Sequence, residues 1–322
     1  MSSKILISDI SKILKDRNGA FLCCASFEKR SLSIPAKINT LQFKKVLIFA
    51  SEDRCPYISE TASEINNIFL NKTQIVNTRM RDPLSTADSI AKAVQQLIAK
   101  NIKDVIIDIS TFTHEMLLIL IMILWRNKDH FSKVTCIYTG ARDYSLGDSV
   151  ENKWLSKGCK EVRSVFGFPG QIIPGRPSCL IVLVGFEHER ATRMITTMEP
   201  ELLLLGRGLP SSEHLTHDSH KAPMEYFHKL VEDMGSSRGD LKTFEFSCRD
   251  ANETIQLLQR QIEDTPEYNH IVVPLNTKIS TVAVGLVALQ DTSLQVCYAE
   301  PETYNFAAYS EPDNKVTIFD IW

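Results

Sequence analysis

Five stretches in the first half of the chain have counterparts in the second half, in the same order. FLCCASFEKRSL (21–32) is matched by LIVLVGFEHERAT (180–192), and KKVLIFASEDR (44–54) by PELLLLGRGLP (200–210). Three further pairs follow: MRDPLSTADSIAKAVQQLI (80–98) with CRDANETIQLLQRQI (248–262), DVIIDISTFTHEMLLILIMIL (104–124) with HIVVPLNTKISTVAVGLVAL (270–289), and VTCIYTGARDY (134–144) with LQVCYAEPETY (294–304). Similar segments that recur in order indicate a duplicated structural unit. We therefore predict that the two halves share one fold.

Within each half, short runs rich in Val, Ile and Leu alternate with longer helical stretches. Such runs are typical of parallel strands buried on both faces and joined by crossover helices. The sequence predicts an α/β protein of two tandem Rossmann-like domains with mainly parallel sheets, related by internal duplication. We expect the first domain at 1–150 and the second at 177–322. The segment 151–176, rich in Gly and Pro, is expected to connect them.

Composition narrows the class of protein. The net charge of −3 excludes a strongly basic field that would draw the chain to long nucleic acid or to an anionic membrane. None of the eight cysteines forms a C-x-x-C pair, and the longest apolar block, MLLILIMILW (116–125), is about half a membrane span. The amino-terminal stretch MSSKILISDISKILKD lacks the apolar core of a signal peptide. We expect a reduced, cytoplasmic protein without a membrane segment.

The turn after the first strand of each half carries a compact group of charges. Glu28 and Arg30 occupy it in the first half, and Glu187 and Arg190 in the second. Ligands of open parallel sheets bind at the carboxyl ends of the strands, so these arginines are candidate phosphate clamps held by the neighbouring carboxylates. Two alternatives stay open: ordinary surface salt bridges, or glutamates that serve as general bases in a hydrolase.

The turn after a later strand is rich in hydroxyl groups. The first half has Asp108, Ser110, Thr111 and Thr113 there, and the second has Asn276, Thr277 and Lys278. Hydroxyls, a lysine and free N–H groups at a helix start suit a phosphate. Helix capping explains the same residues without a ligand. In an enzyme, Asp108 is a further candidate general base.

Three other features stand out. Tyr138 and Tyr298 end matching strands and are candidates for stacking on a base, although a strand-end tyrosine commonly serves packing. Arg81 and Arg249 each precede an aspartate that starts a helix, and capping does not explain the arginines. The histidine-containing stretch SSEHLTHDSH (211–220) has no counterpart in the first half, so we predict neither a metal site nor a cofactor.

A duplicated Rossmann-like unit with polar turns after the first and fourth strands resembles the CRISPR-associated Rossmann-fold (CARF) sensors. The turn Asn276-Thr277-Lys278 is similar to the strand-then-Thr/Lys turn that lies near a ligand phosphate in that family. The resemblance covers nearly the whole chain and implies a cyclic oligonucleotide enclosed by two such domains. The stretch from Ile107 to Thr113 also echoes the phosphate turn of phosphoribosyltransferase-like domains.

Three functions remain open from sequence. The first is a sensor of a bacterial antiviral defence or stress system, which holds a nucleotide or short oligonucleotide between its domains and passes its output to a separate effector protein. Arg30, Arg190 and Lys278 are then expected to contact phosphate. The second is an enzyme that acts at a phosphate or glycosidic bond of a nucleotide. The third is a non-catalytic scaffold for protein interactions.

Overall fold

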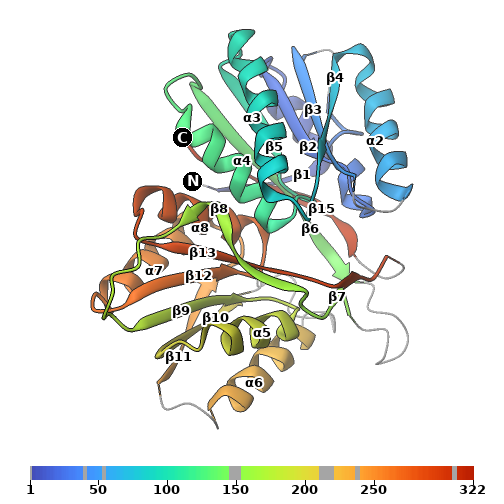
Figure 1. Cartoon of the computed structure of the whole chain (residues 1–322). Coiled ribbons are helices and arrows are strands. Elements are labelled where there is room, and N and C mark those ends of the chain that lie inside the picture. The colour runs from blue at the N-terminus through green and yellow to red at the C-terminus, as the bar shows by residue number, and fades with distance from the viewer. Residues whose placement is uncertain are drawn as a thin grey trace. The chain divides into compact units, whose positions relative to one another are not determined.

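A computed structural model describes residues 2–38, 42–52, 56–144, 154–209, 221–235, 240–306 and 310–322. The chain divides into two compact units. The first contains Met1–Tyr144 and Ser310–Trp322, and the second contains Ser145–Tyr309. Each unit is a sheet with helices on both faces (Figure 1). No helix among the described residues is both long enough and apolar enough to cross a bilayer.

The first unit is built on a seven-stranded sheet in the order β1-β15-β6-β5-β2-β3-β4. Five strands run parallel: β2 (Ala20–Cys24), β3 (Lys45–Ser51), β4 (Thr73–Thr78), β5 (Asp104–Asp108) and β6 (Lys133–Tyr144). The strand β15 (Ser310–Asp320) is antiparallel to β6, and β1 (Ser3–Leu6) is antiparallel to β15. The helices are α1 (Ile10–Ile13), α2 (Pro56–Phe69), α3 (Pro83–Ala99) and α4 (His114–Arg126), with short 3-10 turns η1 (Ile7–Asp9), η2 (Lys29–Leu32) and η3 (Leu70–Lys72).

The second unit has a six-stranded sheet in the order β11-β10-β9-β12-β13-β8. Five strands are parallel: β9 (Ser178–Val184), β10 (Leu202–Leu209), β11 (Leu241–Ser247), β12 (Asn269–Pro274) and β13 (Gln295–Glu300). The strand β8 (Glu161–Pro169) is antiparallel to β13, and β7 (Ser156–Lys157) forms a separate two-stranded sheet with β14 (Thr303–Tyr304). The helices are α5 (His188–Met198), α6 (Lys221–Gly235), α7 (Ala251–Glu263) and α8 (Lys278–Gln290).

The predicted fold class is confirmed, and the five sequence pairs fall on matching elements. Read from the far edge, the parallel strands run β4-β3-β2-β5-β6 in one unit and β11-β10-β9-β12-β13 in the other. An antiparallel strand follows in each, β15 or β8, and the first sheet has β1 beyond β15. The five pairs correspond to β2 with β9, β3 with β10, α3 with α7, β5 with β12 and β6 with β13. This shared topology supports the interpretation of an internal duplication.

The domain boundaries differ from those expected. Residues 310–322, expected in the second domain, belong to the first unit because β15 pairs with β6. The expected connection 151–176 contains β8, which completes the second sheet. The physical reason is that an antiparallel strand at the side of a sheet is placed by pairing with a strand far away in the sequence. Local composition does not identify that partner, so it does not predict the domain to which the strand belongs.

Capping and burial explain the helices. Asp82 accepts a hydrogen bond from the Ser85 backbone N–H at 2.9 Å, with Pro83 following, so the predicted start of α3 is confirmed. The apolar face of α2 packs with α1 on one face of the first sheet, where Phe21, Phe43 and Phe69 meet. In the second unit α5 and α6 pack on one face, through Met194, Leu230 and their neighbours. The polar turns are thereby left at the carboxyl ends of the strands.

Candidate functional site

Each sheet has one point where the strand order reverses, between β2 and β5 in the first unit and between β9 and β12 in the second. Crevices at the carboxyl ends of such switch points are the usual ligand sites of open α/β sheets. In both units a polar side chain reaches over this point to the carbonyl that ends the first strand. Thr111 Oγ1 donates to the Cys24 carbonyl at 2.7 Å, and Asn276 Nδ2 donates to the Val184 carbonyl at 2.5 Å.

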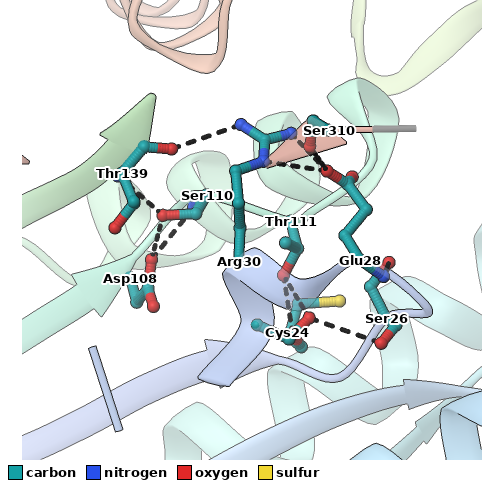
Figure 2. Close-up of polar contacts among 10 residues, drawn as sticks. Cys24, Ser26, Glu28, Arg30, Asp108, Ser110, Thr111, Thr139 and Ser310 are labelled. Carbon is teal, nitrogen blue, oxygen red and sulfur yellow. Dashed lines mark hydrogen bonds and ion pairs between the residues drawn. The ribbon is translucent and has the colours of Figure 1, made fainter. Parts of the chain in front are cut away.

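In the first unit the switch point is closed by its own side chains. Asp108, Ser110 and Thr111 are 2%, 0% and 7% exposed. Ser110 donates to Asp108 Oδ1 through its hydroxyl at 2.5 Å and its backbone N–H at 3.1 Å, and the Ser110 hydroxyl accepts from the Thr139 N–H at 2.9 Å (Figure 2). Thr113 is the N-cap of α4 and accepts from the Met116 N–H. These polar groups are satisfied internally, as the capping interpretation requires.

The carboxyl group of Asp108 is perturbed by this burial. Loss of water raises its pKa from 3.8 to about 6, and the hydrogen bonds from Ser110 and the charge of Arg30 offset only part of that rise. A carboxyl with a pKa near 6 has the proton affinity that a general acid or base needs. Its 2% exposure, however, leaves no surface for a substrate.

The first charged turn forms a buried ion pair. Arg30 Nε donates to Glu28 Oε2 at 2.8 Å, and the two side chains are 7% and 9% exposed. Arg30 Nη1 also donates to the Thr139 carbonyl at 3.2 Å, as Figure 2 shows. The predicted pairing is therefore present, but it is neither an exposed clamp nor a surface salt bridge.

The second charged turn repeats this arrangement. Arg190 Nη1 donates to Glu187 Oε2, and the two side chains are 4% and 13% exposed. Arg190 Nε donates to the Ala299 carbonyl in β13 at 2.7 Å, which matches the bond from Arg30 to Thr139 in β6. Burial acts to lower the pKa of Arg190, but the Glu187 carboxylate, with smaller contributions from Tyr298 and Tyr304, more than offsets it. The net shift of the pKa is upward, so this guanidinium stays charged. Both turns use their charges to hold the protein together.

The two tyrosines lie in the core. Tyr138 and Tyr298 are 8% and 2% exposed, so neither ring presents a face to a base. The guanidinium groups of Arg163 and Arg190 lie 5.5 Å and 5.4 Å from the centre of the Tyr298 ring, within cation–π range. The packing interpretation fits both residues.

The turn after β12 is more open than its counterpart. Asn276, Thr277 and Lys278 are all half-buried. Thr277 is the N-cap of α8, accepts from the Ser280 N–H at 3.3 Å and donates to the Cys248 carbonyl at 3.2 Å. Cys248 Sγ in turn donates to Asn276 Oδ1 at 3.2 Å. The turns that follow β11 and β12 are thus joined at the carboxyl edge of the second sheet.

A groove of about 430 Å³ opens at the carboxyl end of β11, beside the turn that follows it. Its wall consists of Leu209 at the end of β10, Glu245, Phe246 and Ser247 at the end of β11, Arg249 in the next turn, and Glu253, Gln256, Leu257 and Arg260 on one face of α7. Sites for small ligands commonly enclose about 300–1,000 Å³. Sequence reasoning singled out Arg249 but missed Arg260, Gln256 and Ser247. For Gln256 and Arg260 the available signal was their spacing with Glu253 and Leu257, which places all four on one face of α7.

No metal site is defined. Among the described residues, no three His, Cys, Asp or Glu side chains are grouped to hold an ion. The histidine-containing stretch 211–220 lies outside those residues.

No protein-family model matches the chain, and no curated protein does. Among solved structures, it is similar to a solute-binding protein of an ABC transporter from Bacillus halodurans with bound myo-inositol, at 12% identity over 78% of this chain and 72% of that one, with a TM-score of 0.25. It is also similar to a periplasmic sugar-binding protein from Legionella pneumophila (10% identity, 86% and 77% covered, TM-score 0.26) and to a UDP-GlcNAc 2-epimerase from Neisseria meningitidis bound to UDP-GlcNAc (11%, 79% and 76%, 0.26). Scores this low assign no function.

Proposed function

We propose that the chain binds a phosphate-bearing small ligand, a nucleotide or a short oligonucleotide, at the carboxyl edge of the second unit. The observation that carries the proposal is the groove with Arg249 and Arg260 in its wall. A hydrogen bond from Cys248 to Asn276 joins the turn after β11 to the half-buried turn that ends in Lys278. Guanidinium groups bind phosphate by paired charge-assisted hydrogen bonds. Ser247 and Gln256 add hydrogen-bonding groups to the same wall.

The other groups in the wall favour a nucleotide over a bare anion. Glu245 is paired with Arg207, whereas Glu253 is an exposed carboxylate in the groove wall. A carboxylate repels phosphate but accepts hydrogen bonds from ribose hydroxyls or a base amino group. Leu209 and Leu257 supply an apolar surface for a base. One ligand that carries phosphate, hydroxyls and an aromatic ring satisfies all three kinds of contact.

In its fuller form, the proposal makes the chain a nucleotide sensor of a bacterial defence or stress system that passes its output to a separate effector. The support for this part is the resemblance to tandem CARF sensors, carried by the duplicated topology and the Asn276-Thr277-Lys278 turn. In contrast, Arg30, Arg190, Tyr138 and Tyr298 are engaged in internal contacts. The burial of Asp108, Ser110 and Thr111 likewise makes the first unit's switch point a poor candidate for ligand contact.

The test is a binding measurement against adenosine triphosphate, a cyclic dinucleotide, a cyclic oligonucleotide and inorganic phosphate. Thermal shift and calorimetry measure binding, and chromatography of the same samples measures turnover. We expect at least one nucleotide to bind more tightly than inorganic phosphate. Arg249→Gln combined with Arg260→Gln should weaken its affinity at least about tenfold, because each removes charge-assisted hydrogen bonds.

The matched control is Lys242→Gln, which removes an exposed cation from the amino-terminal end of β11. It should leave affinity unchanged. If the control and the double variant lost affinity equally, the loss would reflect the overall charge of the protein and not the groove. That result would overturn the assigned site. Binding with product formation would instead favour the enzyme interpretation, and no binding by any of the four compounds would refute the proposal.

A further inference from the structure

Each unit contains an antiparallel strand that follows, along the chain, the last parallel strand of the other unit. After β6 of the first unit, the chain continues through β7 to β8, which pairs with β13 of the second unit. After β13, it continues through β14 to β15, which pairs with β6 of the first unit. The parallel strands of the two sheets share one order, and β8 and β15 each pair with the last of them. In the simplest arrangement, each antiparallel strand would pair with the parallel strand just before it in the chain, β8 with β6 and β15 with β13. In the observed arrangement the partners are exchanged: β8 pairs with β13, and β15 pairs with β6.

We infer that the chain is a reciprocally strand-exchanged pair of units, and that the Glu28–Arg30 and Glu187–Arg190 turns are clasps that fasten the exchanged segments. This assigns a role to the most conspicuous repeated motif of the sequence, which the ligand groove leaves unused. It also predicts that the two units unfold together.

The first clasp joins three elements of the first unit. The Ser310 hydroxyl at the start of β15 donates to Glu28 Oε2 at 3.0 Å (Figure 2). Lys29 Nζ donates to Glu311 Oε1 at 2.6 Å. Arg30 holds the same Glu28 carboxylate and donates to the Thr139 carbonyl in β6, the strand with which β15 pairs. The turn therefore touches both the exchanged strand and its partner.

The second clasp repeats this junction with different side chains. The Ser156 hydroxyl in β7 donates to Glu187 Oε1, and the Gly158 N–H donates to Glu189 Oε2 at 2.8 Å. Both donors lie on the segment that leads into β8. Arg190 holds Glu187 and donates to the Ala299 carbonyl in β13, the partner of β8.

Burial makes the clasps selective. A carboxylate that loses water is strongly destabilised unless its hydrogen bonds are made, so a segment without the serine leaves a buried acceptor partly unsatisfied. Buried polar pairs of this kind specify register and partner in some proteins, even where they add little net stability. Here they favour docking of a segment that brings a serine hydroxyl to the buried carboxylate, as Ser310 does for Glu28 and Ser156 does for Glu187.

The exchanged strand β15 is also anchored at its far end. The Ile321 N–H donates to the Val134 carbonyl at 2.9 Å, and the Trp322 ring packs on Trp125 with centroids 5.6 Å apart. The strand lies inside the sheet, between β1 and β6. Loss of β15 would therefore also remove the pairing of β1.

The test uses hydrogen exchange by mass spectrometry on the full chain. Ser310→Ala should raise exchange about tenfold in β15 and in the turn at 28–31, since it removes one hydrogen bond to a charged acceptor. Ser156→Ala should do the same in β8 and around Glu187. The control, Ser132→Ala, removes an exposed hydroxyl that donates to the Lys103 carbonyl. It should change neither region, and unchanged exchange of β15 and β8 in the two clasp variants would overturn the clasp assignment.

A protease site inserted at residues 307–309 of the full chain tests the exchange while every clasp residue is retained. After cleavage, the fragment that carries β15 should stay with the remaining chain in size-exclusion chromatography and separate only in denaturant. Elution of that fragment alone, with the melting temperature of the rest unchanged, would refute the exchange.

Discussion

The buried carboxyl of Asp108 makes the stability of the first unit depend on pH in a direction opposite to the usual acid denaturation. Its pKa is about 6 in the folded chain and near its ordinary 3.8 when unfolded. Between these values the folded chain binds a proton that the unfolded chain does not. The resulting stabilisation is full below pH 3.8 and is lost as the pH rises through 6.

The size of this stabilisation follows from the difference between the folded and unfolded pKa of Asp108. About two pKa units correspond to about 3 kcal/mol over the full range, of which about 1 kcal/mol is recovered between about pH 7.5 and about pH 5. The assay is urea unfolding followed by tryptophan fluorescence. Two of the three tryptophans, Trp125 and Trp322, lie in the first unit, so a Trp154→Phe background reports on that unit.

Two variants separate Asp108 from all other titrating groups. Asp108→Asn cannot titrate, so the excess stabilisation at about pH 5 should disappear. Ser110→Ala removes a hydroxyl that lowers the pKa of Asp108, so the pH dependence should grow and move to higher pH. A wild-type protein whose unfolding free energy changes with pH just as that of Asp108→Asn does would refute the reasoning.

Three further predictions concern stability. Arg30→Met and Arg190→Met should each cost about 3 kcal/mol of unfolding free energy in urea titrations, since each leaves a buried carboxylate unpaired; Arg79→Met, from an exposed pair with Glu52, should cost under about 1 kcal/mol, and equal losses would contradict the burial argument. Removal of residues 310–322 should abolish the cooperative transition seen by Trp125, and a transition unchanged in midpoint would show that β15 is dispensable. Gly208→Ala should weaken nucleotide affinity as well as stability, because its Cβ would collide with Cys248 Sγ and lie 2.8 Å from Asn276 Nδ2; unchanged affinity in calorimetry would place the ligand elsewhere.

Local patterns were sufficient to predict the alternating elements and the helix starts. Asp82 and Asp250 cap α3 and α7 because a short acidic side chain satisfies free N–H groups within its own turn. Such signals lie within a few residues of the structure they determine, so they can be recognised from the sequence alone. The duplicated blocks then fixed which strands correspond.

The pairing of the exchanged strands and the burial of the polar turns could be learned only from the structure. The pairing of β15 with β6 joins residues far apart in the chain, and no local pattern names the partner. Arg30 and Arg190 carry the same charge whether exposed or buried, and only the carbonyls of Thr139 and Ala299 show which applies. The groove combines β10, β11 and one face of α7, so its arginines come together only in the fold.

The most direct test of the ligand site is hydrogen exchange of the wild-type chain with and without each nucleotide of the binding panel at saturation. Binding in the groove predicts protection over residues 245–260 and 276–280, with residues 108–116 unchanged. Protection confined to 108–116, or no protection in either region with any of the nucleotides, would contradict the placement of the site on the second unit.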